Sequence, residues 1–528
     1  MTMNQIDGHP FRPRTAAMSA TPELVTSDGT GTTGPGPSRE MSVASTTEAQ
    51  GRPGPVLRED RNCWRIGTSD RASVLVDCDN YFNALEKTLR QARRSVLIAG
   101  WDFDDGIVLD RSSSKGNGPA LGKLLRELVE AEPELHVRIL VWSTAILHSL
   151  RSFSSLLLHR GWHDHPRIRL KLDTRHAFYA ALHQKIVTVD DQVGFVGGVD
   201  LTSGRWDTRF HPIKDRRRRL TDGNDHGPVR DVQMMVDGPV AASLAELLRT
   251  RWEMASGERL QPVAATADAW PSDLDPHFRN QQIGIARTLP RLENRPPARE
   301  IRFLVEDMLQ SARGLVYIED QYFSNQHLGR ILEASLKQRE GPEIIVISSK
   351  TLPGLVEQVI MGGNRKRLIR RLKKADIHNR FRIYYPVART NKDTKEAEIF
   401  VHSKLICVDN RILRIGSSNL NNRSLGVDSE CDLVIEADDD PAEKMITRQC
   451  HGLMADLAGT TRSSFCRVLR CMGSYVPALD YLAGRKHRLQ AFRVDCDGPT
   501  ETLPLTSFLD PARPISLSRI FRSGTDGD

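Results

Sequence analysis

The 528-residue chain lacks any long uninterrupted hydrophobic run. No apolar segment approaches the roughly 20 residues that a transmembrane helix needs. The N-terminal stretch also lacks the apolar core that a signal peptide requires. We therefore expect a protein without membrane-spanning segments, located in the cytoplasm or held peripherally at a membrane surface.

The sequence also lacks cysteine pairs with the spacing of zinc ligands. None of its eight cysteines forms a CxxC pair of that kind, which argues against a structural zinc site. Cys407 and Cys431 lie in apolar stretches, where a buried thiol is the expected state. The number of cysteines neither demands nor excludes an oxidising compartment.

The charge balance is mildly basic, with a formal net charge of +7. Such an excess suits an anionic partner, either a phospholipid surface or a nucleic acid, but a solvated surface explains it equally well. Four consecutive arginines, at 216–219, lie among His, Pro, Gly and Asp. We expect a solvated charged loop there, and contact with anionic headgroups or another polyanion is the alternative.

Composition and hydrophobic patterning divide the chain into four parts. Residues 1–57 are rich in Gly, Pro, Ser and Thr and predict a disordered leader. Residues 58–285 and 286–485 each alternate amphipathic helices with apolar strands, which predicts a largely parallel or mixed sheet covered by helices. In the first of these parts, Asp79 and Asn80 are expected to cap a helix. The role of the tail, residues 486–528, is not assigned.

Two stretches of the chain carry the same pattern of chemically active residues. His402, Lys404 and Asp409 are followed by Gly416, Ser417 and Asn419; the other stretch has the residues His183, Lys185, Asp190, Gly197, Gly198 and Asp200. Alternate residues of a strand face the same side, so each histidine is expected to lie beside its lysine.

The two stretches belong to an internal duplication. The two histidines are 219 residues apart in the sequence, and the helices that precede the first apolar strand of each half repeat at almost the same interval. We therefore predict an α/β fold of two α/β/α sandwich lobes with mixed sheets. The lobes are related by a pseudo-twofold axis, and the active site lies at their interface.

Two histidines and two lysines suit the cleavage of a phosphodiester. One neutral imidazole can attack phosphorus, while the other, protonated, donates to the leaving oxygen. Lys185 and Lys404 would bind the non-bridging oxygens, and Ser417 and Asn419 can add neutral donors. Because the lysines supply the positive charge, no metal or cofactor is required.

Each histidine also needs a hydrogen-bond acceptor that fixes its tautomer. Glu430 follows His402 by 28 residues, at the head of the next strand, and is the candidate in the second half; Asp231 is its counterpart in the first half. Asp190 and Asp409 lie at the far ends of their strands, so they are expected to cap turns rather than to take part in catalysis.

The paired motifs resemble those of the phospholipase D superfamily, His-x-Lys-x4-Asp followed by Gly-Ser-x-Asn. The stretches GGVDLTSGRWDT at 197–208, RDVQMMVDGP at 230–239 and YIEDQYF at 317–323 are similar to phosphatidylcholine-type members, including bacterial ones. The resemblance implies hydrolysis of phospholipids at a membrane surface to phosphatidic acid and a headgroup alcohol, with transfer to another alcohol also possible. It makes His183 the nucleophile and His402 the general acid.

Three alternatives stay open. They are a phosphatidyl transferase of the cardiolipin synthase type, a nucleic-acid phosphodiesterase, and an inactive lipid-binding scaffold. The GRWD and YIEDQYF stretches argue against a nucleic-acid substrate, and the intact His and Lys pairs argue against a scaffold. Because one chain holds both motifs, a monomer is expected to own a complete site.

Overall fold

The computed structural model describes residues 54–112, 118–143, 161–176, 180–292, 295–352, 354–389, 396–486, 488–501 and 510–513. Most of the predicted leader, residues 1–53, lies outside these ranges. Its last four residues do not: Val56 is buried, and its N–H donates to the carboxylate of Glu436 at 2.9 Å. The prediction of disorder is therefore wrong for Val56 and Leu57, which are held on the second half of the chain.

A continuous series of paired strands crosses the first half of the chain. From its outer edge inward the strands follow the order β4 (Ile168–Asp173), β3 (His136–Trp142), β2 (Ser95–Gly100), β5 (Ile186–Val189), β6 (Val193–Gly197), β8 (Val232–Asp237) and β1 (Arg65–Val76). The three outer strands are parallel and the others antiparallel, so the sheet is mixed, as predicted.

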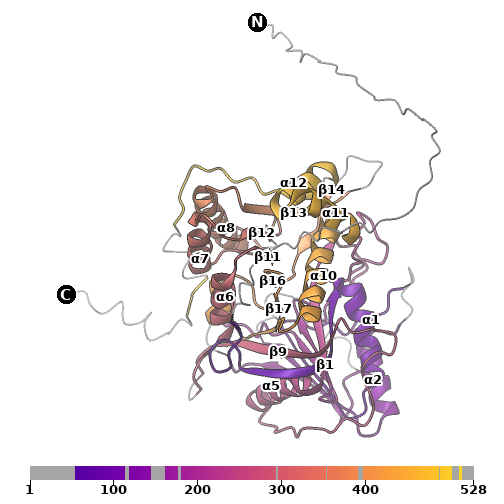
Figure 1. Cartoon of the computed structure of the whole chain (residues 1–528). Helices are drawn as coiled ribbons and strands as arrows, with labels where there is room; N and C mark the ends of the chain where they lie inside the picture. Colours follow the sequence, from indigo (N-terminus) through magenta and orange to yellow (C-terminus); the bar gives the residue numbers. More distant parts are fainter. Residues whose placement is uncertain are drawn as a thin grey trace, which may run out of the picture. The chain divides into compact units, whose positions relative to one another are not determined.

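The second half repeats this order from its own inner strand outward. The strands are β9 (Phe278–Leu289), β18 (Glu430–Glu436), β17 (Ile412–Gly416), β16 (Leu405–Val408), β11 (Leu315–Glu319), β12 (Glu343–Ile347) and β13 (Phe381–Arg389). β1 and β9 pair with each other in antiparallel register and join the halves (Figure 1). The mirrored order confirms the duplicated α/β fold, and residue 285, where the first lobe was predicted to end, lies within β9.

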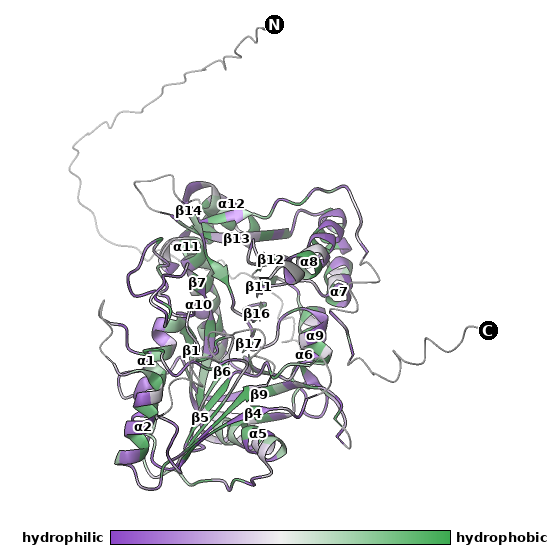
Figure 2. Ribbon diagram, turned by 180° about the vertical axis from the view of Figure 1, so that it is seen from behind, coloured by the Kyte–Doolittle hydropathy of each residue, from purple (hydrophilic) through white to green (hydrophobic). Residues whose placement is uncertain are grey.

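Helices cover both faces of these strands. α1 (Asp77–Leu89) and α2 (Leu121–Ala131) enclose a core of the first half, and α6 (Glu300–Ser311), α7 (Gln326–Lys337) and α8 (Leu355–Ala375) enclose the equivalent core of the second. A third core contains residues of both halves and is covered by α5 (Gly238–Ser256), α10 (Asp440–Leu457), α11 (Arg462–Met472) and α12 (Tyr475–Lys486). Figure 2 shows largely hydrophobic strands and helices with one polar face.

Two local predictions need correction. α1 begins at Asp77, so Asp79 and Asn80 lie inside its first turn instead of capping it. The arginine run is only partly solvated. Arg218 is buried, and its guanidinium lies 3.2 Å from the carboxylate of Asp207, while Arg217 stacks 4.8 Å from the ring centroid of Trp206. A buried carboxylate attracts this arginine out of water, which the charge run alone could not reveal.

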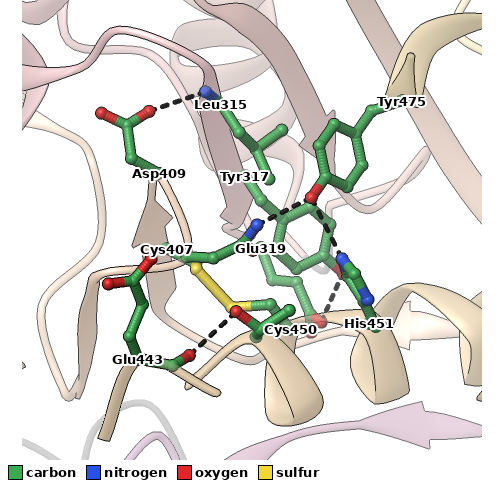
Figure 3. Close-up of a disulfide and its surroundings, with 11 residues drawn as sticks. Leu315, Tyr317, Glu319, Cys407, Asp409, Glu443, Cys450, His451 and Tyr475 are labelled. Atoms are coloured by element: carbon green, nitrogen blue, oxygen red, sulfur yellow. Dashed lines mark hydrogen bonds between the residues drawn. A yellow bond between two sulfur atoms is a disulfide. The ribbon is translucent and has the colours of Figure 1, made fainter. Parts of the chain in front are cut away.

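A disulfide joins the strand within the second motif to a covering helix. Cys407 on β16 is bonded to Cys450 on α10, so the expectation of a free thiol is wrong for Cys407, although Cys431 is a buried thiol (Figure 3). Beside it, the Tyr475 hydroxyl lies 3.0 Å from His451 Nε2. The two cysteines meet because β16 and α10 pack in the shared core.

The tail is partly built into the fold. β19 (Leu489–Ala491) pairs with the edge strand β13, and Asp510 is buried, accepting the N–H of Arg423 at 3.0 Å. Within the described ranges, every helix is too short or too polar to span a lipid bilayer.

Candidate active site

Both motif histidines lie in segments that pair with the opposite half. β15 (Phe400–Val401), just before His402, pairs with β7 (Val229–Arg230) of the first half, and the His402 N–H donates to the Arg230 carbonyl at 2.8 Å. In the same way the His183 N–H donates to the Ser429 carbonyl at 2.9 Å. The backbone of each half therefore places the histidine of the other.

The imidazole–carboxylate pairs also cross between the halves. His183 Nδ1 lies 2.9 Å from Glu430 Oε2, and His402 Nδ1 lies 2.7 Å from Asp231 Oδ2. Glu430 and Asp231 are the predicted acceptors, but each serves the histidine opposite to the one assigned from the sequence. Both carboxylates stand at the heads of β18 and β8, which flank the central β1–β9 pair. The site is thus assembled across the pseudo-twofold axis, and each ring turns its Nε2 away from its carboxylate.

The two lysines have different surroundings. Lys185 Nζ forms a buried ion pair with Asp200 Oδ2 at 2.8 Å. Lys404, also buried, donates to the carbonyl oxygen of His402 at 2.5 Å. Asn419 occupies the position of the duplicate that corresponds to Asp200 and carries no charge. Within the described residues, Lys404 therefore has no counterpart of the Lys185–Asp200 ion pair, and the carboxylates whose charges act on it are those of Asp231 and Asp320.

The small residues after the motif strands make room for the carboxylates. A Cβ on Gly198 would lie 2.3 Å from Asp231 Oδ1, so only glycine fits beside that carboxylate. Ser417, at the equivalent position, donates its hydroxyl to Glu430 Oε2 at 2.5 Å. Its proton is therefore directed at the partner of His183 and not, as predicted, at the substrate.

The glycines one residue earlier, Gly197 and Gly416, lie so close to the neighbouring strand that a side chain would clash with it. A Cβ on Gly197 would lie 2.2 Å from Gln233 Oε1, and a Cβ on Gly416 would lie 1.9 Å from Asp432 Oδ1. Both glycines thus allow the strand ends to approach the heads of β8 and β18.

Asp190 and Asp409 have the structural role predicted for them. Each carboxylate accepts three consecutive backbone N–H groups, from residues 93–95 and 313–315 respectively, at 2.7–2.8 Å. Each also begins a turn whose first two residues have positive φ, between 51° and 54°. These aspartates bind the loop before the neighbouring strand and lie at the strand ends remote from the histidines.

Burial sets the proton affinities of the site. It lowers the pKa of His183 and of His402 well below the usual range, and the positive charges of Lys185 and Lys404 add to both shifts. Burial also raises the pKa of Asp231 to about 6 and that of Glu430 well above its ordinary value. It lowers the pKa of Lys404 to about 8. The lowered pKa of His183 favours its neutral imidazole, as a nucleophile requires.

A buried ionic network that sequence reasoning missed holds the His402 segment. Arg230 bridges Asp77 of α1, at 3.0 Å, and Glu319 of β11, at 3.1 Å. Glu319 also accepts the hydroxyl proton of Ser403 at 2.6 Å. Both residues lie in stretches that the sequence singles out, because Arg230 precedes Asp231 and Glu319 lies in the YIEDQYF stretch. No local pattern, however, shows that the two side chains meet.

The comparisons agree with this two-part construction. The family model described as Phospholipase D matches residues 88–275, and the model described as Cardiolipin synthase, PLD-like domain, matches residues 305–449. Each match contains one histidine–lysine pair. Within the described residues, no cluster of three or more His, Cys, Asp or Glu side chains could hold a metal ion.

Several curated proteins are similar over much of the chain. Phospholipase D A of Dictyostelium discoideum is 24% identical over 453 residues, covering 74% of this chain and 35% of its own length. Phospholipase D1 of Saccharomyces cerevisiae is 23% identical, covering 71% and 27%, and Phospholipase D gamma 1 of Arabidopsis thaliana is 24% identical, covering 64% and 56%. The chain thus spans about a quarter to a half of the lengths of these relatives.

A solved structure shares the fold. The crystal structure of phosphatidylserine synthase from Haemophilus influenzae Rd KW20 superposes with a TM-score of 0.50 and 12% sequence identity. The match covers 86% of this chain and 94% of that one.

Proposed function

The chain belongs to the phospholipase D superfamily, and from that membership we propose that it cleaves the distal phosphodiester of glycerophospholipids at a membrane surface. The products are phosphatidic acid and the headgroup alcohol. The observation that supports the proposal is the pair of crossed imidazole–carboxylate contacts, each of which orients one of the two motif histidines. A phosphodiester needs such a nucleophile, an acid and fixed positive charge.

In the first step His183 Nε2 attacks phosphorus, because its Nδ1 is engaged with Glu430. A phosphorus–nitrogen bond forms, and the bond between phosphorus and the headgroup oxygen breaks. His402, whose Nδ1 is held by Asp231, donates the Nε2 proton to that oxygen. Lys185 and Lys404 stabilise the charge on the non-bridging oxygens.

In the second step the roles of His402 reverse. Its neutral Nε2 takes a proton from water, and the water oxygen bonds to phosphorus while the bond to His183 breaks. Phosphatidic acid leaves, and both imidazoles return to their starting states. An alcohol in place of water yields a new phospholipid through the same intermediate.

Transfer to an alcohol is the second candidate function. The observation that favours it is the match of the second half to a model named for cardiolipin synthase. A nucleic-acid phosphodiesterase would use the same residues, but the three similar curated proteins named above are phospholipases D.

The test measures headgroup release and phosphatidic acid formation from mixed phospholipid vesicles in EDTA, with ethanol as the competing acceptor. Wild type is compared with His402→Ala and Lys185→Ala. We expect phosphatidic acid and phosphatidylethanol from wild type and neither from the variants. Cleavage of a nucleic-acid phosphodiester without turnover of any phospholipid would contradict the proposed substrate.

A further inference from the structure

A loop that is hydrogen-bonded to the start of β7 carries an arginine, Arg205, that the mechanism above does not use. Gly204, with φ +79°, begins the loop, and Trp206 is buried at 1% exposure. Asp207 anchors it: its carboxylate accepts the N–H of Val229 at 2.9 Å and contacts His211 Nδ1 at 3.0 Å. Arg205 therefore lies directly before two residues that are held in place, Trp206 and Asp207.

The hydrogen bond between Val229 and Asp207 connects this loop to the His402 side of the site. Val229 begins β7, the strand that pairs with β15 immediately before His402. Asp231, the partner of His402, follows two residues after Val229. The loop and the histidine are therefore held by the same three-residue segment, 229–231.

Within the described part of the chain, the Arg205 side chain has no hydrogen-bond or ion-pair partner, and its Nε atom is buried. Arg205 as a whole is half-buried. Nearby arginines have ion-pair partners: Arg218 contacts Asp207 through Nη1, although its Nε is likewise buried without a partner, and Arg209 pairs with Asp456 at 2.5 Å. The charge of Arg205 is felt in the centre, because it adds to burial and to Lys404 in lowering the pKa of His402. A buried donor without a partner is costly, so a ligand that pairs with it is favoured.

The charges of the site are compatible with a further cation, which Arg205 can supply. Burial raises the pKa of Glu430 well above its ordinary value. Lys185 pairs with Asp200, and the carboxylates of Asp231 and Asp320 act on Lys404, so carboxylates balance both lysines. A phosphodiester carries one negative charge, and a centre without net positive charge would attract it weakly. One additional cation gives the site the charge that its substrate requires.

We propose that Arg205 is a third phosphate-binding cation, which contacts a non-bridging oxygen of the reacting phosphodiester on the His402 side. This inference rests on the proposed function for the identity of the substrate. A planar guanidinium suits the role because it can donate two parallel hydrogen bonds to a phosphate.

The experiment compares wild type with Arg205→Lys, Arg205→Gln and the control Arg209→Gln, which removes an exposed arginine of the same loop. Turnover of phosphatidylcholine vesicles gives kcat and KM, and isothermal titration calorimetry gives the Kd of inorganic phosphate. We expect Arg205→Gln to lower kcat/KM by about 10²-fold and to weaken phosphate binding. Arg205→Lys should recover part of both, and Arg209→Gln should match wild type.

The outcomes separate this inference from the proposed function. If wild type turns over the vesicles and Arg205→Gln equals it in kcat/KM and phosphate affinity, Arg205 does not bind the phosphate. If no phospholipid is cleaved but Arg205→Gln still binds phosphate more weakly than Arg209→Gln, the phosphate contact stands and the lipid substrate is wrong. Equal losses in both glutamine variants would indicate a disturbed loop and overturn the specific role.

Discussion

The two halves of the molecule agree in their turns and differ around their lysines. Asp190 and Asp409 close equivalent loops with the same three backbone contacts. In contrast, Lys185 is paired with Asp200, whereas Lys404 has Asn419 at the equivalent position. Backbone-binding residues are thus the same in both halves, while the residues facing the reaction centre differ.

The carboxylates differ in a related way. Asp231 reaches His402 with the shorter side chain and lies against Gly198. Glu430 reaches His183 with the longer side chain and accepts the hydroxyl of Ser417. One duplicated backbone thus gives its two histidines different hydrogen-bond partners and different nearby charges, which suits the separate tasks that we propose for them.

The largest effect is expected from removing either carboxylate. Asp231→Asn and Glu430→Gln should each lower kcat/KM by about 10²–10⁴-fold, because an amide holds the imidazole tautomer and charge poorly. A substrate with a p-nitrophenol headgroup needs no general acid, because p-nitrophenolate is a good leaving group. On this substrate the loss in kcat/KM should be smaller for Asp231→Asn and unchanged for Glu430→Gln. Glu246→Gln, in an exposed ion pair, is the matched control. Equal behaviour of the two variants with both headgroups would remove the distinction between the halves.

A smaller effect is expected at the residues beside these carboxylates. Gly198→Ala places a methyl group against Asp231 and should lower kcat/KM by about 10²-fold. Ser417→Ala removes one hydrogen bond to Glu430 and should cost about tenfold. Steady-state kinetics on phosphatidylcholine measures both losses in kcat/KM. A greater loss in Ser417→Ala than in Gly198→Ala would contradict the expectation.

The pH dependence of kcat/KM should be set by the groups around His402. Below about pH 6 Asp231 becomes protonated and stabilises the His402 imidazolium less, and above about pH 8 Lys404 loses its charge. We therefore expect kcat/KM to rise through about pH 6 and to fall beyond about pH 8. In Asp231→Asn, assayed on the p-nitrophenol substrate, the acidic limb should disappear. Its persistence would assign that limb to another group.

The smallest effect on activity is expected from the disulfide, which only the second half has. Thr188 stands where Cys407 stands in the duplicate. Closing a loop of 43 residues contributes about 4 kcal/mol to the free energy of unfolding in the chain-entropy description. Cys450→Ala should lower the denaturant midpoint and leave kcat/KM within about twofold. A reducing agent should reproduce the loss in wild type and leave Cys450→Ala unaffected.

The duplicated fold and most of the site could be predicted from the sequence. The same motif occurs twice with the same internal spacing, which indicates both the duplication and the residues of the site. His183, Lys185, His402 and Lys404 were found this way, and so were Asp231 and Glu430. The partner of each histidine could not be found, because sequence distance favours the carboxylate of the same half, whereas the β7–β15 pairing brings in the other one.

Three further features depend on contacts between distant segments. The Arg230 network joins α1 to β11, Arg218 is drawn inward by Asp207, and Cys407 meets Cys450 only because β16 packs against α10. A run of arginines and a scattered pair of cysteines carry no information about such partners. These features follow from tertiary packing rather than from local pattern.

The central claim is that His183 is the nucleophile and His402 the acid and base. The most direct measurement uses His402→Ala with a phosphatidyl-p-nitrophenol substrate, rapid mixing and mass spectrometry of the quenched protein. The account predicts a burst of one p-nitrophenol per chain and a phosphatidyl group trapped on the peptide containing His183, with no burst from His183→Ala. A burst from His183→Ala, with the adduct on the peptide containing His402, would contradict it.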